Sequence, residues 1–96
     1  MIDFLSECNI NNSTIDKMKE RYPTELFDLN CNKKEITKII EYLRSIGIND
    51  IDKLLLDETP LFFKSMDYIE KKFSMYNIPM LVQRINDNCE EIEIIL

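Results

Sequence analysis

Apolar residues recur at intervals of three and four along most of the chain, which is the spacing of helices with one buried face. The longest such stretch predicts a helix from about Lys33 to Ile46. Its apolar face consists of Ile36, Ile39, Ile40, Leu43 and Ile46. Asn32 followed by Glu35 predicts a capping pair at its start. Gly47, the only glycine of the chain, is expected to end this helix in a left-handed conformation.

Shorter helices are predicted on both sides of this one. Apolar spacing and turn residues place them at about residues 2–9, 13–22, 50–57, 66–76 and 80–87. Asn49 and Ser65 are expected to be N-caps. Pro60 and Pro79 suit the first turn of a helix, where their missing N–H costs nothing. The apolar residues that follow Pro60, among them Phe62 and Phe63, are expected to form a short packing element.

The C-terminal segment, residues 89–96, fits two patterns. Ile92, Ile94 and Leu96 alternate as in a strand, whereas Ile92, Ile95 and Leu96 share one face of a helix. Since no other stretch predicts a strand, we expect a helical turn or an irregular tail packed on the preceding helix. The alternative is that this apolar end, Ile92–Leu96, joins two chains in a symmetric homodimer.

An internal repeat relates the middle of the chain to its C-terminal part. An offset of 30 residues places Ile39, Leu43, Ile46, Gly47, Ile48 and Ile51 over Ile69, Phe73, Tyr76, Asn77, Ile78 and Leu81. Asn77 thus stands where Gly47 stands, and Asn9 does so in the N-terminal part. We therefore predict a single all-α domain over residues 1–96, a short right- or left-handed half-solenoid of helix-turn-helix units. It would contain two units and a truncated third.

The central unit also resembles a known repeat. Leu43-Arg44-Ser45-Ile46-Gly47-Ile48, followed by Ile51, Leu54-Leu55 and Pro60-Leu61, is similar to the repeat of the mitochondrial transcription termination factor family. The resemblance implies units of two helices and a short 3₁₀ helix, stacked into a curved half-solenoid. It implies nucleic-acid binding in an electropositive concave groove and no enzymatic activity. It also implies that Pro60 to Phe62 form the short third element, with an earlier copy at Pro23 to Phe27.

Basic side chains at repeated positions are the candidates for nucleic-acid contacts. These are Lys17, Lys53, Arg84, Lys34 and Lys38. Lys17 and Lys53 occupy matching positions, but Arg84 is one residue away from its match. A step of one residue turns a helical side chain by about 100°. We therefore prefer the interpretation that these are solvated outer faces with partial ion pairing.

Composition and charge narrow the class of protein. The chain is 45% hydrophobic and 31% charged, which is typical of a folded globular protein. Its net charge is −6, and the last twelve residues contribute four acids and no base. No apolar run approaches the ~20 residues of a membrane span, and the N-terminal residues do not form a secretory signal. We expect a cytoplasmic protein without a membrane partner.

Residues that carry catalysis or bind metals are scarce. The chain has no His, and its three cysteines are widely spaced, so we expect reduced, mostly buried thiols. Asp50 and Asp52 are expected to lie in the first turn of a helix, where acids favour the helix dipole. We therefore expect no enzyme, no metal and no cofactor.

Three functions are compatible with this sequence. The leading hypothesis is an interaction module that binds a protein partner, as helical solenoids commonly do. The second is nucleic-acid binding, as the resemblance implies. The third is a small acidic inhibitor or nucleic-acid mimic, which would line one surface with acidic side chains.

Overall fold

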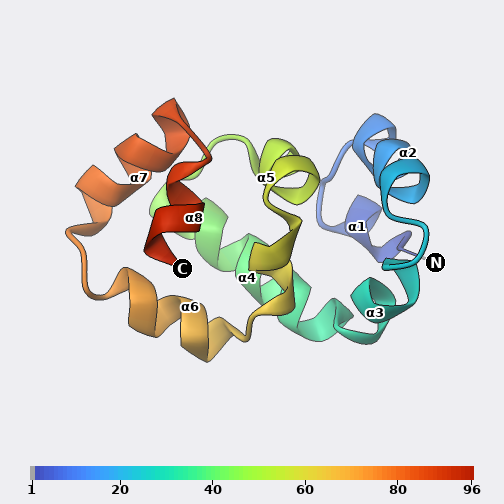
Figure 1. Cartoon of the computed structure of the whole chain (residues 1–96), viewed down its shortest axis with the longest axis horizontal. Coiled ribbons are helices and arrows are strands. Elements are labelled where there is room, and N and C mark those ends of the chain that lie inside the picture. Colours follow the sequence, from blue (N-terminus) through green and yellow to red (C-terminus); the bar gives the residue numbers. More distant parts are fainter. Residues whose placement is uncertain (1) are drawn as a thin grey trace.

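The structure is a computed structural model that describes residues 2–96, and over these residues the fold is entirely helical (Figure 1). The elements, in order, are α1 (Phe4–Glu7), α2 (Asn12–Arg21), α3 (Leu26–Cys31), α4 (Lys33–Ile46), α5 (Ile51–Asp57), η1 (Thr59–Phe63), α6 (Met66–Phe73), α7 (Ile78–Asp87) and α8 (Glu91–Ile95). All are α-helices except η1, a 3₁₀ helix. The all-α prediction is confirmed.

The longest helix, α4, organises the other elements. It contacts α3, α5, α6, α7 and η1, while α2 packs on α5 and α1. Figure 1 places α7, α5 and α2 along the upper edge of the molecule and α6 and α3 along the lower edge, with α4 between them. The molecule measures 36 × 24 × 22 Å along its principal axes.

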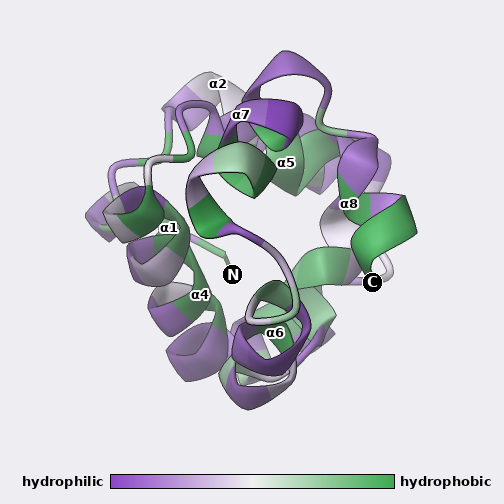
Figure 2. Cartoon of the chain, turned by 90° about the vertical axis from the view of Figure 1, so that its left-hand side faces the viewer, coloured by the Kyte–Doolittle hydropathy of each residue, from purple (hydrophilic) through white to green (hydrophobic). Residues whose placement is uncertain are grey.

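The core forms on the predicted apolar face of α4. Ile36, Ile39, Ile40 and Leu43 are buried, and Ile46 is half-buried. Figure 2 shows that α4 and α6 turn their hydrophobic sides toward the interior and their hydrophilic sides outward. Full burial of one such side chain contributes about 1.5–3 kcal/mol to folding. The apolar spacing along α4 is thus what fixes its orientation in the molecule.

Gly47 ends α4 as predicted. Its φ of +107° is left-handed, and its N–H donates to the Arg44 carbonyl at 3.1 Å. The Ile48 N–H donates to the Leu43 carbonyl at 3.0 Å, which satisfies a second carbonyl at the helix end. Asn9, with φ +62°, makes the corresponding turn after α1, where the next residue, Ile10, donates to Leu5.

The expectation that Asn77 makes the same left-handed turn is wrong. Its φ is −71° and its ψ 113°, which is extended backbone. The Asn77 side chain instead caps α7, because its Oδ1 accepts from the Met80 N–H at 3.1 Å. The preceding helix, α6, already ends at Phe73, so the longer connection needs no left-handed residue at Asn77. Asparagine suits both roles, and its surroundings decide between them.

Two of the other predicted caps are also wrong. Asp50, not Asn49, caps α5 by accepting from the Lys53 N–H at 3.0 Å. Asn32 makes no side-chain cap on α4, and the carboxylate of Glu35 accepts from the Met66 N–H at 3.0 Å instead. In both cases a hydrogen bond formed by the folded chain replaces the local one.

The remaining capping predictions are confirmed. Ser65 caps α6, since its Oγ accepts from the Tyr68 N–H at 3.1 Å. Pro60 lies in the first turn of η1 and Pro79 in the first turn of α7. These prolines occupy positions where the helix needs no N–H donor.

The apolar element after Pro60 packs only in part. Phe62 is fully buried, but Phe63 is 40% exposed, so its expected packing role is wrong. Leu61 and Phe62 take the inward positions of η1, and Phe63, at its C-terminal end, is left partly in solvent. The expected earlier copy at Pro23 to Phe27 differs as well, because α3 is an α-helix that begins at Leu26 and leaves Phe27 exposed.

The C-terminal segment is helical, as we favoured. In α8, Ile92 and Ile95 are buried in the chain's own core, whereas Ile94 is 73% exposed. This arrangement caps the core beside α7, and the homodimer stays a prediction.

All three cysteines are free, but only Cys89 is buried. The expected burial of Cys31 is wrong, because Cys31 is exposed at the end of α3.

Candidate functional site

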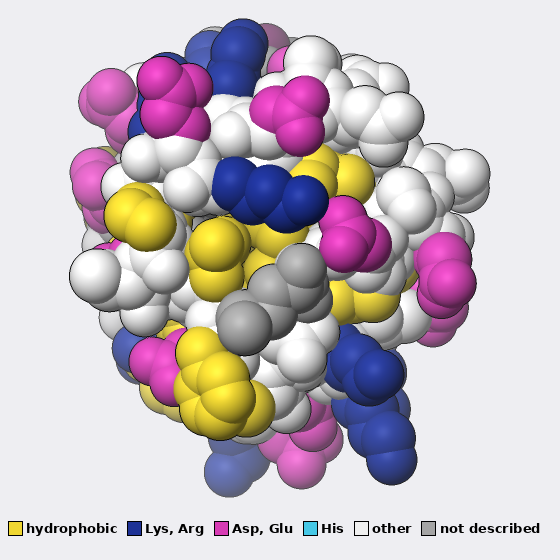
Figure 3. All heavy atoms as spheres, turned by 90° about the vertical axis from the view of Figure 1, so that its right-hand side faces the viewer, with side chains coloured by type: hydrophobic (Ala, Val, Ile, Leu, Met, Phe, Trp, Pro, Cys, Tyr) yellow, Lys and Arg dark blue, Asp and Glu magenta, His cyan; other side chains and the backbone are white. Residues whose placement is uncertain are grey.

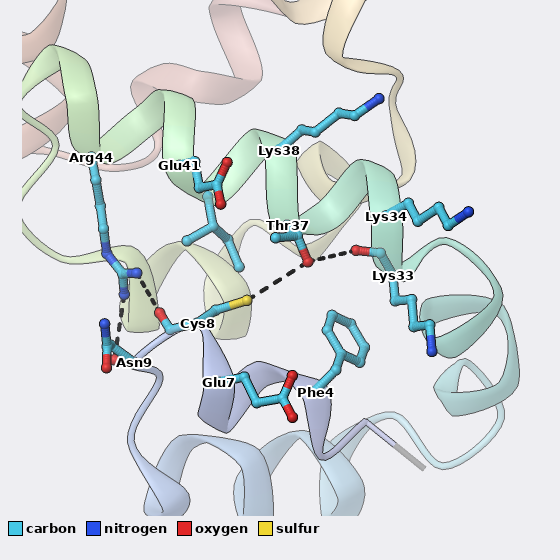
Figure 4. Close-up of a pocket in the computed structure, with 11 residues that line it drawn as sticks. Phe4, Glu7, Cys8, Asn9, Lys33, Lys34, Thr37, Lys38, Glu41 and Arg44 are labelled. Carbon is cyan, nitrogen blue, oxygen red and sulfur yellow. Dashed lines mark hydrogen bonds between the residues drawn. The ribbon is translucent and has the colours of Figure 1, made fainter.

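A groove of about 650 Å³ lies between α1 and α4 (Figure 4). The outward face of α4 forms one side of it. Since the opposite face of α4 is buried in the core, its outward face carries the polar side chains of the helix. We call this surface the α1–α4 groove.

Lysines form the rim of the groove. Lys33 extends beside Phe4, while Lys34 and Lys38 extend outward from α4 (Figure 4). These three exposed lysines have no ion-pair partner among residues 2–96. Their ammonium groups are therefore available to a ligand without first breaking a salt bridge.

The other end of the groove is closed by contacts between α1 and α4. The Arg44 guanidinium donates to the carbonyls of Cys8 and Asn9. The left-handed turn at Asn9 exposes these two carbonyls because no helix continues beyond it. Cys8 Sγ also lies 3.7 Å from Thr37 Oγ1, which donates to the Lys33 carbonyl at 2.8 Å. These bonds hold the floor in place.

The groove combines positive charge with apolar surface. Four basic side chains line it against two acidic ones, Glu7 and Glu41, although the whole chain has a net charge of −6. Half-buried Phe4 supplies accessible apolar surface beside the lysines, whereas Ile40 belongs to the buried core. Such a surface suits a ligand that presents carboxylates together with apolar groups.

Only part of the predicted basic set comes together here. Lys34 and Lys38 line the groove, but Lys17 lies on α2, Lys53 on α5 and Arg84 on α7. Arg84 is occupied by an ion pair with Glu91, at 2.9 Å between Nη2 and Oε2. The five residues therefore form no single track.

Sequence reasoning missed Lys33 and Arg44 as members of the groove. The signal was present, because Lys33, Thr37, Glu41 and Arg44 recur at intervals of four, four and three along α4. This stripe runs beside the buried isoleucines. It could have been found by following the polar face of α4 as closely as the apolar one.

The two aspartates at the start of α5, Asp50 and Asp52, have structural roles. Asp50 caps its own helix, α5, as described above. Asp52 Oδ2 accepts from the Asn11 N–H at 2.9 Å and from Thr14 Oγ1 at 2.7 Å, and so it caps α2 across the interface of α2 and α5. Within residues 2–96, no three His, Cys, Asp or Glu side chains are arranged to hold a metal ion.

No family model, curated protein or solved structure matches this chain. The resemblance to transcription termination factor repeats therefore stays a prediction. No helix within the described part of the chain has both the length and the apolar character needed to cross a membrane.

Proposed function

We propose that this chain is a non-enzymatic helical-repeat interaction module whose α1–α4 groove binds an acidic segment of a protein partner. The observation that carries the proposal is the set of unpaired lysines, Lys33, Lys34 and Lys38, beside the apolar surface of half-buried Phe4. An extended segment with alternating carboxylates and apolar side chains would satisfy both features.

The order of the elements supports a repeat. Each of three consecutive stretches holds three helical segments: α1–α2–α3, α4–α5–η1 and α6–α7–α8. The turns at Asn9 and Gly47 support the equivalence of the first two, since both are left-handed and both are followed by an isoleucine that bonds back to a leucine. Stacked units of this kind present continuous grooves between neighbours.

A protein partner accounts for the charges better than nucleic acid. Nucleic-acid affinity depends on several bases that neutralise phosphates together. The groove offers three unpaired lysines, and Lys17, Lys53 and Arg84 lie on other elements. A net charge of −6 also repels a polyanion over a distance. A short acidic peptide needs fewer cations and gains from the apolar floor.

The acidic-mimic hypothesis has less support. Figure 3 shows the end of the molecule formed by α1, α2 and α3, where Lys and Arg side chains alternate with Asp and Glu side chains around apolar groups. On this face the acids are therefore not gathered, as they would be on the binding surface of a nucleic-acid mimic.

The test is a titration of ¹⁵N-labelled protein with a short synthetic peptide in which Glu and Leu alternate. We expect saturable amide shifts confined to α1 and α4. The triple variant K33Q/K34Q/K38Q is expected to weaken binding roughly 3- to 150-fold, since each exposed ion pair contributes about 0.2–1 kcal/mol. The control K17Q/K53Q/K71Q removes the same charge elsewhere and is expected to leave the affinity unchanged.

Nucleic acid is tested in parallel by fluorescence anisotropy with labelled duplex DNA and single-stranded RNA at low salt. We expect no binding at micromolar protein. Binding that weakens steeply with salt and disappears in K33Q/K34Q/K38Q, together with no response to the peptide, would overturn the proposal in favour of a phosphate site.

A further inference from the structure

A second concave surface lies between η1 and α8, on elements that take no part in the α1–α4 groove. It is a pocket of about 330 Å³, at the small end of the range for ligand pockets. Three carboxylates, those of Asp57, Glu58 and Glu93, line it. Its remaining walls are largely apolar and include Leu61, Ile92 and Leu96. We call it the η1–α8 pocket.

Glu58 is the unusual residue of this pocket. It is only 5% exposed, yet its carboxylate has no hydrogen bond and no ion pair with any other side chain of residues 2–96. Its backbone is fixed at the junction of α5 and η1, since its N–H donates to Leu54 at 2.8 Å and its carbonyl accepts from Leu61 at 3.0 Å. The side chain is thereby held at the pocket wall.

The surroundings disfavour the charge of Glu58. Burial, and then the negative charges of Glu93, Glu90 and Asp57, raise the pKa of its carboxyl above the ordinary value. No oxygen of Glu58 is both buried and without a partner, so its carboxylate opens to the pocket although most of the residue is covered. A carboxyl group with a perturbed pKa in a cleft is a candidate binding group.

Within residues 2–96, no basic side chain forms an ion pair with Glu58. Lys64 lines the same pocket, but its ammonium lies over the Tyr68 ring, 5.2 Å from its centre, and makes no ion pair. Arg21 approaches only Asp57, at 3.8 Å, and both side chains of that pair are about half exposed. The pocket thus leaves the Glu58 carboxylate open to a positive group of a partner.

We propose that the η1–α8 pocket binds an arginine side chain of a partner protein. The guanidinium would lie between Glu58 and Glu93, and its aliphatic stem would pack on Leu61, Ile92 and Leu96. Arginine fits this site because its guanidinium is planar, weakly hydrated and matched to carboxylates, while its stem is apolar. A hard metal ion fits poorly, since it needs six or more convergent oxygen ligands and no such group exists within residues 2–96.

The test uses Nα-acetyl-arginine-methylamide as the probe and ¹³C-methyl-labelled protein as the detector. We expect saturable shifts of the Leu61, Ile92 and Leu96 methyl groups, with a dissociation constant in the millimolar range. Glu58→Gln removes the charge with almost no change of shape and is expected to weaken binding at least tenfold. Glu20→Gln, at an exposed position of α2, is the matched control and is expected to bind like the wild type.

Two outcomes would overturn this inference. One is the absence of saturable shifts at these methyl groups up to the solubility limit of the probe. The other is an equal response to Nα-acetyl-glutamine-methylamide, which would mean that the pocket recognises apolar and amide groups without the guanidinium. Neither outcome affects the α1–α4 groove, which is built on other elements and carries the opposite charge.

Discussion

Gly47 has a backbone conformation that a residue with a side chain would adopt only at a cost in free energy. Its φ of +107° lies in the left-handed region, which residues with a Cβ atom rarely adopt. A Cβ at this position would lie 3.5 Å from Val82 Cγ1, which is an ordinary contact. The cost of a side chain here is therefore in the backbone and not in packing.

We expect Gly47→Ala to lower the free energy of unfolding by about 1–2 kcal/mol, the penalty of an L-residue in the left-handed region. Asn9→Gly, at the corresponding turn, is the matched substitution and is expected to change stability by less than about 0.5 kcal/mol. Urea denaturation followed by circular dichroism measures both. An unchanged midpoint for Gly47→Ala would contradict the left-handed conformation.

Glu58 predicts a dependence of stability on pH. Because the pKa of its carboxyl is raised in the folded chain, the folded state binds more protons than the unfolded state between the two pKa values. The contribution of Glu58 to the free energy of unfolding therefore falls as the pH rises from the pKa of its carboxyl in the unfolded chain through the pKa in the folded chain. Glu58→Gln is expected to stabilise the protein at about pH 7, and the gain should shrink near about pH 4.

Urea denaturation of both proteins at the two pH values checks this expectation. The difference between wild type and variant isolates the contribution of Glu58, because groups whose pKa shifts in the opposite direction contribute equally to both proteins. Asp3 is such a group, since the hydrogen bond from Lys19 is the first cause that lowers its carboxyl pKa. A gain of equal size at both pH values would show that the carboxylate is not destabilised by burial.

At the scale of elements, the short helix α8 depends on its packing. Five residues are too few for a stable isolated helix, since nucleation alone is unfavourable. The burial of Ile92 and Ile95 supplies the stability, and Ile94 points away from the core. The segment therefore completes the core.

We expect Ile92→Ala to destabilise the protein by about 2–4 kcal/mol, because it leaves a cavity in a packed core. Ile94→Ala, two residues along on the exposed face, is the control and should change stability by less than about 0.5 kcal/mol. Thermal denaturation compares the two. Sedimentation of Ile94→Asp addresses the homodimer, which this change would dissociate if Ile94 contacts a second chain.

Other elements are joined by polar side chains that act across interfaces. Asp52 on α5 caps α2, and Asn86 on α7 bonds to the turn after α4 through both the Asn49 N–H and the Gly47 carbonyl. Each of these bonds fixes the position of one helix end relative to another helix. α7 is therefore connected to the turn between α4 and α5 that Gly47 creates.

At the scale of the whole molecule, the two concave surfaces differ in the charge of the side chains that line them. The chain is acidic, yet the α1–α4 groove is lined by more bases than acids, and the η1–α8 pocket gathers carboxylates. Because the lysines of the groove are exposed, their attraction for a carboxylate is screened by salt. The peptide affinity measured for the groove is thus expected to fall as the ionic strength rises.

The sequence alone determined the features that depend on neighbours three or four residues apart. The all-α class, the bounds of α4, the buried isoleucines and the left-handed Gly47 all follow from such local patterns. The cap at Ser65 and the positions of Pro60 and Pro79 do so as well. Each is decided within one helical turn, before any long-range packing forms. Of the candidate site, the sequence identified Lys34 and Lys38.

Tertiary structure alone decided where the polar side chains went. Glu35 binds Met66 and not its own helix end, Asp52 caps a helix 41 residues earlier, and Asn77 caps α7 where a left-handed turn was expected. The burial of Glu58 and the meeting of Lys33 with α1 also arise only when helices pack. The reason is that a polar side chain accepts any donor within reach, and packing determines which donors are within reach.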